Sequence, residues 1–138
     1  MFAKFQTGRI SSKHVAAPDG SEIRLFHQMK GGGLSQCTLP SGLTSSAVSH
    51  KSVDEIWFFT EGFGLVWRKQ ENIEETIKVE PGISLTIPKG TKFQFKNTEN
   101  IPLRFIISTM PPWPGESEAL PEEGPWPTSF PNNKEMQT

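Results

Sequence analysis

The chain has 138 residues, of which 34% are hydrophobic and 21% are charged, and its formal net charge is −1. This length is typical of one domain with a sizeable core, and the composition is that of a globular rather than a disordered protein. The small net charge argues against a nucleic-acid partner, because nucleic-acid binders normally carry a basic excess on one face.

No segment predicts a membrane span, a secretory signal or a disulfide. The longest apolar run, Ile56-Trp57-Phe58-Phe59, is far too short to cross a bilayer. The first ten residues carry charges and lack an apolar signal core. Cys37 is the only cysteine, which excludes an intrachain disulfide and a cysteine-rich zinc cluster. We therefore expect a cytoplasmic protein without a membrane partner.

Short apolar or alternating runs follow one another along the chain, separated by Gly, Pro, Asn and Glu-Gly turns. No amphipathic helix pattern persists for three turns. The predicted strands are Glu22–Met29, Leu34–Leu39, Ser45–His50, Glu55–Thr60, Phe63–Lys69, Glu74–Val79, Ser84–Ile87, Lys92–Lys96 and Leu103–Ser108. The run Gly31-Gly32-Gly33 is predicted as a turn. About eight to ten short strands at this spacing predict an all-β sandwich or barrel.

The strand predicted at Glu55–Thr60 is apolar on both faces. Side chains of a strand alternate, so Glu55, Trp57 and Phe59 share one face while Ile56 and Phe58 share the other. Such a strand is usually central in its sheet, or its outer face is covered by another segment or another subunit.

The end of the chain differs in composition from the rest. From Ser108 onward there are five acidic residues against one lysine, and seven of the twelve prolines. We therefore expect residues 1–110 to form the β domain with an extended N-terminal arm, and residues 111–138 to form a Pro-rich acidic tail. Trp113 and Trp126 should anchor this tail to the barrel or to a partner subunit, and a tail that closes the barrel mouth is a second possibility.

Two spaced motifs resemble those of the cupin superfamily. The first, G-x5-H-x-H-x3–4-E-x6-G, matches Gly42, His50, Glu55 and Gly62, with Val48 at the position of the first histidine. The second, G-x5-P-x-G-x2-H-x3-N, falls in register on "GISLTIPKGTKFQFKN". That segment supplies Gly82, Pro88, Gly90 and Asn97, with Phe93 at the histidine position.

The resemblance covers residues 34 to 109 and implies a single cupin jelly roll. It also implies a site where three histidines and a glutamate converge on Mn, Fe, Ni or Zn. Only His50 and Glu55 remain of those four ligands, whereas a catalytic metal usually has at least three protein ligands. A divalent metal is therefore expected to be weakly bound or absent. Candidates for a third ligand are His14, His27 and Cys37, none within a motif, and Cys37 is more simply a small buried residue.

Both motif residues are predicted to point into the barrel. The interpretation of His50 and Glu55 as a hydrogen-bonded structural pair competes with their interpretation as catalytic acid and base. The side chains predicted to line an aromatic ligand cavity are Val48, Trp57, Phe59, Trp67, Phe93 and Phe95. The alternative is that these rings fill the barrel and leave no cavity. Gln94 has the opposite parity and is expected outside.

Three functions remain open from the residues and the resemblance. The first is a cupin that binds a small organic ligand, with acid–base chemistry of the isomerase, epimerase or cyclase kind by His50 and Glu55. The second is a divalent-metal-dependent cupin enzyme such as a dioxygenase with a divergent ligand set. The third is a non-catalytic small-molecule sensor. A homodimer is also expected, because cupins commonly pair through sheet faces and edges and because Ile56 and Phe58 form an apolar outer stripe.

Overall fold

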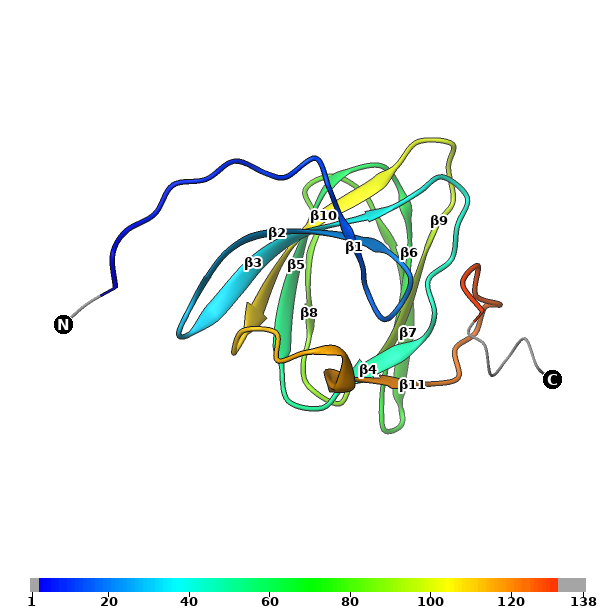
Figure 1. The fold of residues 1–138 in the computed structure, drawn as a ribbon. Helices are drawn as coiled ribbons and strands as arrows, with labels where there is room; N and C mark the ends of the chain where they lie inside the picture. The colour runs from blue at the N-terminus through cyan, green and yellow to red at the C-terminus, as the bar shows by residue number, and fades with distance from the viewer. Residues whose placement is uncertain (1–2, 132–138) are drawn as a thin grey trace.

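The computed structural model describes residues 3–131, which form two antiparallel sheets (Figure 1). The six-stranded sheet has the order β1-β2-β3-β10-β5-β8, and the five-stranded sheet has the order β11-β4-β9-β6-β7. The strands are β1 Val15–Ala16, β2 Glu22–Met29, β3 Gly32–Leu39, β4 Val48–His50, β5 Asp54–Glu61, β6 Gly64–Gln70, β7 Ile73–Val79, β8 Ser84–Ile87, β9 Lys92–Asn97, β10 Leu103–Met110 and β11 Ala119–Pro121. A single 3-10 turn, η1, spans Glu116–Glu118. The predicted all-β jelly roll is confirmed.

All nine predicted strands are present, with small shifts at their ends. The strand expected at Ser45–His50 is only Val48–His50, and two of the three glycines predicted as a turn begin β3 instead. The short strands β1 and β11 were not predicted, because two or three residues cannot display an alternating pattern. Within residues 3–131, no helix is long and apolar enough to cross a membrane.

The core lies between the two sheets and is dominated by aromatic rings. Along β5 the buried side chains are Glu55, Trp57 and Phe59, and the residues between them are exposed, so the predicted faces are confirmed. Trp57 and Phe59 pack on Phe105 of β10 at ring-centroid distances of 4.5 and 4.6 Å. Phe95 of β9 meets the edge of Trp57 at 5.4 Å and joins the two sheets. Burying such rings contributes most of the stability of a sandwich this small.

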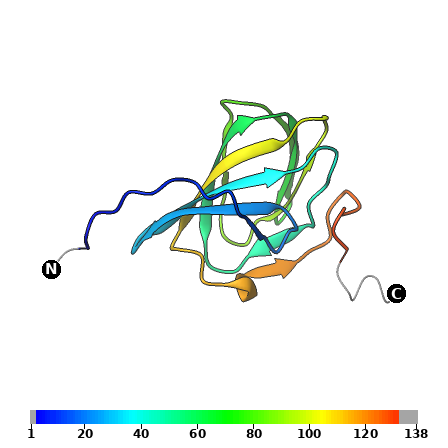
Figure 2. The same cartoon turned by 45° about the horizontal axis from the view of Figure 1, so that its top comes forward.

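The tail packs along the outside of the five-stranded sheet (Figure 2). Gln94 of β9 points away from the core, as predicted, but it is 1% exposed rather than outside in water. Its amide donates to the carbonyls of Ser45 and Trp126, both at 2.8 Å, and its oxygen accepts from the Trp126 N–H at 3.2 Å. One buried amide therefore holds the tail to the segment before β4, while β11 pairs with β4. The predicted tail residues 132–138 lie outside the described residues.

The turn between β5 and β6 depends on a glycine. Gly62 has a φ of +84°, and a Cβ at this position would lie 2.3 Å from the carbonyl oxygen of Pro102. Gly42 also has a positive φ, +73°, but a Cβ there would meet no atom within 4 Å. Both residues occupy glycine positions of the first motif, and only Gly62 is confined by its neighbours.

We predict that Gly62→Ala lowers the free energy of unfolding by more than about 2 kcal/mol, since backbone strain and a steric clash act together. Gly42→Ala should cost only about 1 kcal/mol, because strain acts alone. Urea unfolding of both variants measures the difference. Equal losses would contradict the assigned close contact between Gly62 and Pro102.

Candidate functional site

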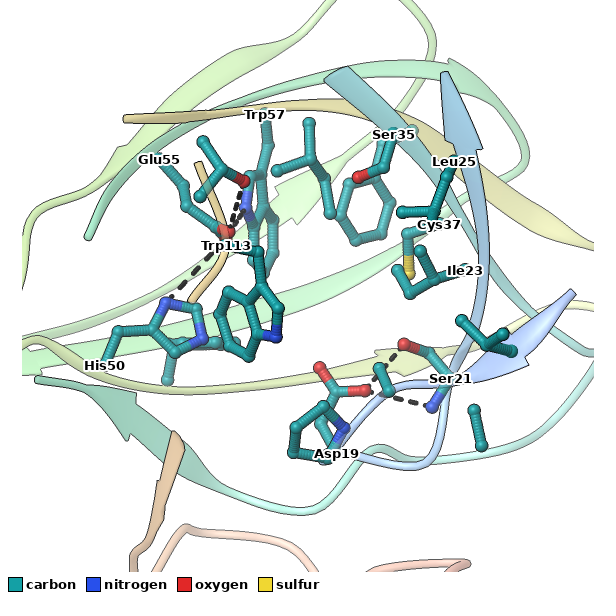
Figure 3. A pocket seen from close by; sticks show the side chains of 18 of the residues that line it. Asp19, Ser21, Ile23, Leu25, Ser35, Cys37, His50, Glu55, Trp57 and Trp113 are labelled. Atoms are coloured by element: carbon teal, nitrogen blue, oxygen red, sulfur yellow. Dashed lines mark hydrogen bonds and ion pairs between the residues drawn. The ribbon is translucent and has the colours of Figure 1, made fainter. Parts of the chain in front are cut away.

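A cavity of about 350 Å³ opens between the sheets at one end of the sandwich. In Figure 3, His50, Glu55 and Trp113 gather on one side, Ile23, Leu25 and Cys37 lie on the other, and Asp19 and Ser21 lie below. The walls therefore come from the β1–β2 turn, from strands of both sheets and from the tail. Small-molecule binding sites are typically cavities of this size that are mostly apolar and carry a few polar groups. The aromatic rings therefore do not fill the barrel completely.

Glu55 places a carboxyl group inside this apolar space. Its side chain is 6% exposed. Oε1 accepts a hydrogen bond from Trp57 Nε1 at 2.9 Å, and Oε2 accepts one from Thr109 Oγ1 at 2.8 Å. Burial raises the pKa of Glu55 to about 7, although both hydrogen bonds oppose the shift. The carboxyl group therefore exchanges a proton near neutral pH.

His50 lies beside Glu55 as a neutral imidazole. Burial lowers its pKa to about 4, against the opposing negative charge of Glu118. Its ring packs edge-on against Phe93 at 5.1 Å and Trp113 at 5.0 Å. His50 Nδ1 is buried without a hydrogen-bond partner and lies 3.9 Å from Glu55 Oε1. Both residues lie at the cavity inside the barrel, as predicted, but the interpretation of them as a directly hydrogen-bonded pair does not fit, since this distance is too long.

Glu118 of η1 fixes the loop after β4. Its carboxylate accepts hydrogen bonds from the N–H of Ser52 at 2.6 Å, the Ser52 hydroxyl at 2.7 Å and the N–H of Val53 at 3.0 Å. Burial opposes ionisation, but these three hydrogen bonds and the nearby His50 outweigh it and lower the pKa of Glu118. The tail is thereby tied to the loop that carries His50 toward Glu55.

The β1–β2 turn contributes residues that sequence reasoning missed. Asp19 Oδ1 accepts hydrogen bonds from the N–H and the hydroxyl of Ser21, at 2.9 and 2.6 Å. Burial raises the pKa of Asp19, and the Ser21 hydrogen bonds oppose the shift. Pro18-Asp19-Gly20 is recognisable as a turn, but nothing in its composition indicates that the turn borders a cavity.

Cys37 also lines the cavity, from β3. Burial, and to a lesser extent the charge of Asp19, raise the pKa of its thiol well above the usual value. Only the thiolate form of cysteine is a good nucleophile, and a thiol with a raised pKa stays protonated. Cys37 is therefore a poor nucleophile. It is a small buried side chain, as predicted, and its protonated thiol forms part of the apolar wall.

The six residues predicted to line the cavity divide into three groups. Trp57, Phe93 and Phe95 border it. Val48 and Phe59 belong to the core but not to the cavity lining. Trp67 was placed wrongly: it pairs with Gln94 across β6 and β9 and so shares the outer face of that sheet. There its indole N–H donates to Glu74 Oε2 at 2.7 Å.

The residues around His50 and Glu55 do not fit a metal centre of three or more protein ligands. Val48 and Phe93 fill the other two motif positions, and the Phe93 ring packs against the imidazole. In residues 3–131, no three His, Cys, Asp or Glu side chains converge closely enough to hold an ion. An apolar ring and an aliphatic side chain supply no electron pair to a metal.

The three residues considered as a third ligand do not complete the set. His14 is exposed and lies 3.8 Å from Glu22 Oε1, and His27 is exposed. Cys37 borders the same cavity, but its raised pKa disfavours the thiolate that a metal requires.

The buried carboxyl group of Glu55 makes a pH-dependent prediction about stability. Its pKa is about 7 in the folded chain, against the ordinary value of 4.5 when unfolded, so the folded state loses stability as pH rises from 4.5 to 7. Glu55→Gln removes this loss because the amide never ionises. At pH 8 the free energy of unfolding of the variant should exceed that of the parent by about 3 kcal/mol. At pH 4.5 the two values should differ by less than about 0.5 kcal/mol.

Urea unfolding at both pH values measures the effect, with Glu123→Gln on the exposed part of the tail as the matched control. The control should change stability equally little at both pH values. A Glu55→Gln variant that is destabilised to the same extent at pH 4.5 and pH 8 would contradict the burial of an ionisable carboxyl group here.

The fold and the motifs are shared with known proteins. The family model described as "Cupin domain" matches residues 35–109, more than half of the chain. An uncharacterized protein of Methanocaldococcus jannaschii is 31% identical over 115 residues, which cover 80% of this chain and 89% of that protein.

Two solved structures share the fold at lower identity. A Bacillus halodurans protein is 24% identical and superposes with a TM-score of 0.61 over 68% of this chain and 73% of its own. A single-residue variant of Streptomyces PAC13, solved with uridine, is 12% identical with a TM-score of 0.63 over 88% of this chain and 92% of its own. The family match, the jelly roll and the two motifs agree that this chain belongs to the cupin domain family.

Proposed function

We propose that this cupin binds a small organic molecule in the cavity between its sheets, and that Glu55 and His50 exchange protons with it. The observation that carries the proposal is a carboxyl group with a pKa of about 7 on the wall of an aromatic-lined cavity of about 350 Å³. A general acid or base acts best when its pKa is near the working pH. Perturbed pKa values in a concave pocket are also a common mark of functional sites.

The surroundings of Glu55 suit repeated proton transfer at one position. Trp57 and Thr109 each donate to a different carboxyl oxygen, so they orient the group without protonating it. The ionised form takes a proton from an acidic position of the bound molecule and can return it at another position. The neutral His50, with its unpartnered Nδ1, is placed to hydrogen-bond the ligand during this exchange. Isomerisation, epimerisation and cyclisation need only such transfers.

A solved neighbour supports the binding half of the proposal. Streptomyces PAC13 shares the fold over nearly its whole length and was solved with uridine. A cupin of this size can therefore hold a small organic molecule, although the low identity carries over neither the ligand nor its contacts.

Proton transfer can be tested without knowing the natural substrate. We predict that the protein accelerates exchange of the acidic C–H protons of phenylacetone in D2O, followed by proton NMR. Glu55→Gln should reduce this acceleration at least a hundredfold, because the amide cannot take up the proton. Ser35→Phe, which places a ring in the cavity from β3, should block both binding and exchange. Gln36→Phe, on the other face of β3, is the matched control.

The outcomes separate the three functions. If phenylacetone binds to the parent but not to Ser35→Phe, and the parent accelerates C–H exchange of no aromatic ketone, the non-catalytic sensor is favoured. Exchange that is lost after dialysis against EDTA and restored by Mn, Fe, Ni or Zn would favour the metal-dependent enzyme. Binding that survives Ser35→Phe would overturn the cavity as the site.

We also propose that the protein forms a homodimer through the outer face of the six-stranded sheet. Ile56 and Phe58 of β5 are 45% and 47% exposed, and Leu34 of β3 is 42% exposed. In the register of the sheet, Ile106 of β10 lies directly opposite Phe58. These four apolar side chains lie on the same face of three neighbouring strands, and we call them the apolar patch. Exposed apolar patches commonly mark interfaces. A second copy can cover the patch with the same patch of its own.

Light scattering after size exclusion should report twice the 15.4 kDa of the chain. Phe58→Glu should yield the monomer, since a charge on the patch opposes its burial. Ile73→Glu, an equally drastic change at an exposed residue of β7, should remain dimeric. A parent protein that runs as a monomer would refute the dimer.

A further inference from the structure

The charged groups that line the cavity have one sign. Asp19, Glu55 and Glu116 border it, whereas no lysine or arginine of the described chain does. His50 contributes no positive charge, because burial keeps its imidazole neutral by lowering its pKa. A ligand that enters this space therefore meets neutral or negative groups, and never a fixed positive one.

The two polar groups beside the cavity lie close enough together for one hydrogen-bond donor group to bond both. His50 Nδ1 and Glu55 Oε1 are 3.9 Å apart, too far to bond each other. One nitrogen atom can lie within hydrogen-bond distance of both. His50 Nδ1 has no partner, and each Glu55 oxygen accepts only one hydrogen bond from protein, which leaves free lone pairs. When the proton of the neutral imidazole is on Nε2, Nδ1 is an acceptor, and the group that satisfies both atoms must donate at least two hydrogen bonds.

The walls around this point suit an apolar body attached to such a donor. Phe93 and Trp113 supply aromatic surface close to the imidazole, and Trp57 borders the same cavity. Aromatic faces attract cations and pack against aliphatic or aromatic groups. An ammonium group has three N–H donors, whereas a hydroxyl group has one.

We infer that the cavity selects a primary ammonium ion carried on an apolar body, with its N–H groups donating to Glu55 Oε1 and His50 Nδ1. This inference rests on the proposed binding of a small molecule in the cavity, and it does not depend on turnover. Carboxylate and phosphate ligands are selected against, because they would bring a second negative charge to Glu55 and Asp19 without a counter-charge.

The pH dependence of binding follows from the groups that face Glu55. These are Asp19 from the β1–β2 turn, Cys37 from β3, His50 from β4 and Glu118 from η1. Burial raises the pKa of Glu55 to about 7, so an ammonium ion must displace a proton from it below that pH. His50, with a pKa of about 4, stays neutral over the same range. Ammonium affinity should therefore fall as pH drops from 8 to 6, while the affinity of a neutral ligand should not.

Three probes share a phenylethyl body and differ in the head group, which is an ammonium, a hydroxyl or a carboxylate: 2-phenylethylamine, 2-phenylethanol and 3-phenylpropanoate. Isothermal titration of the full chain at pH 8 should give at least tenfold tighter binding of the amine than of the alcohol. The carboxylate should not bind at millimolar concentration. At pH 6 the preference for the amine should shrink to about a third or less of its value at pH 8.

The preference for the amine over the alcohol should disappear in Glu55→Gln and persist in the control Glu123→Gln. If the alcohol or the carboxylate binds as tightly as the amine or more tightly, the inference is overturned. If that binding is also lost in Ser35→Phe, the proposal that a small molecule binds in the cavity still stands. A preference for the amine that survives Glu55→Gln would also overturn it. If none of the three probes binds, the proposed function fails together with the inference.

Discussion

The buried carboxyl group of Glu55 is the constraint on which the site depends. A sandwich of this size is stabilised by aromatic packing, and every other inward side chain of β5 is apolar. An ionisable group in that row loses its hydration, and the two hydrogen bonds from Trp57 and Thr109 compensate for only part of the lost hydration energy of the carboxylate. The uncompensated part raises the pKa of Glu55 to about 7. A chain selected for stability alone would place an apolar residue at this position.

Much of the fold could be predicted from the sequence, because it depends on local patterns. Alternation along β5 and the glycines and prolines of the two motifs predict strands, turns and the family with little reference to distant contacts. Trp67 illustrates the limit. Which face of β6 it occupies depends on the register between β6 and β9, and a shift of one residue exchanges the faces. The aromatic character of the residue carries no information about that register.

The site was only half predictable for a similar reason. His50 and Glu55 are recognisable by their spacing, but a local pattern shows neither the 3.9 Å between them nor the packing of Phe93 and Trp113 on the imidazole. Asp19 reaches the cavity through a turn that begins outside any long strand. Gln94 was read correctly as facing outward, yet its burial depends on a tail far away in the sequence. Contacts between distant segments leave no local pattern to detect.

The family match ends at residue 109, four residues before Trp113, and begins sixteen residues after Asp19. The central β segment therefore supplies His50 and Glu55, while both ends of the chain supply part of the cavity wall around them. These ends can diverge among relatives without altering the segment by which the family is recognised. Two cupins of this kind with the same motifs can differ in the ligands that enter their cavities. Whether two relatives bind the same ligand is better judged from the turn around Asp19 and the tail around Trp113.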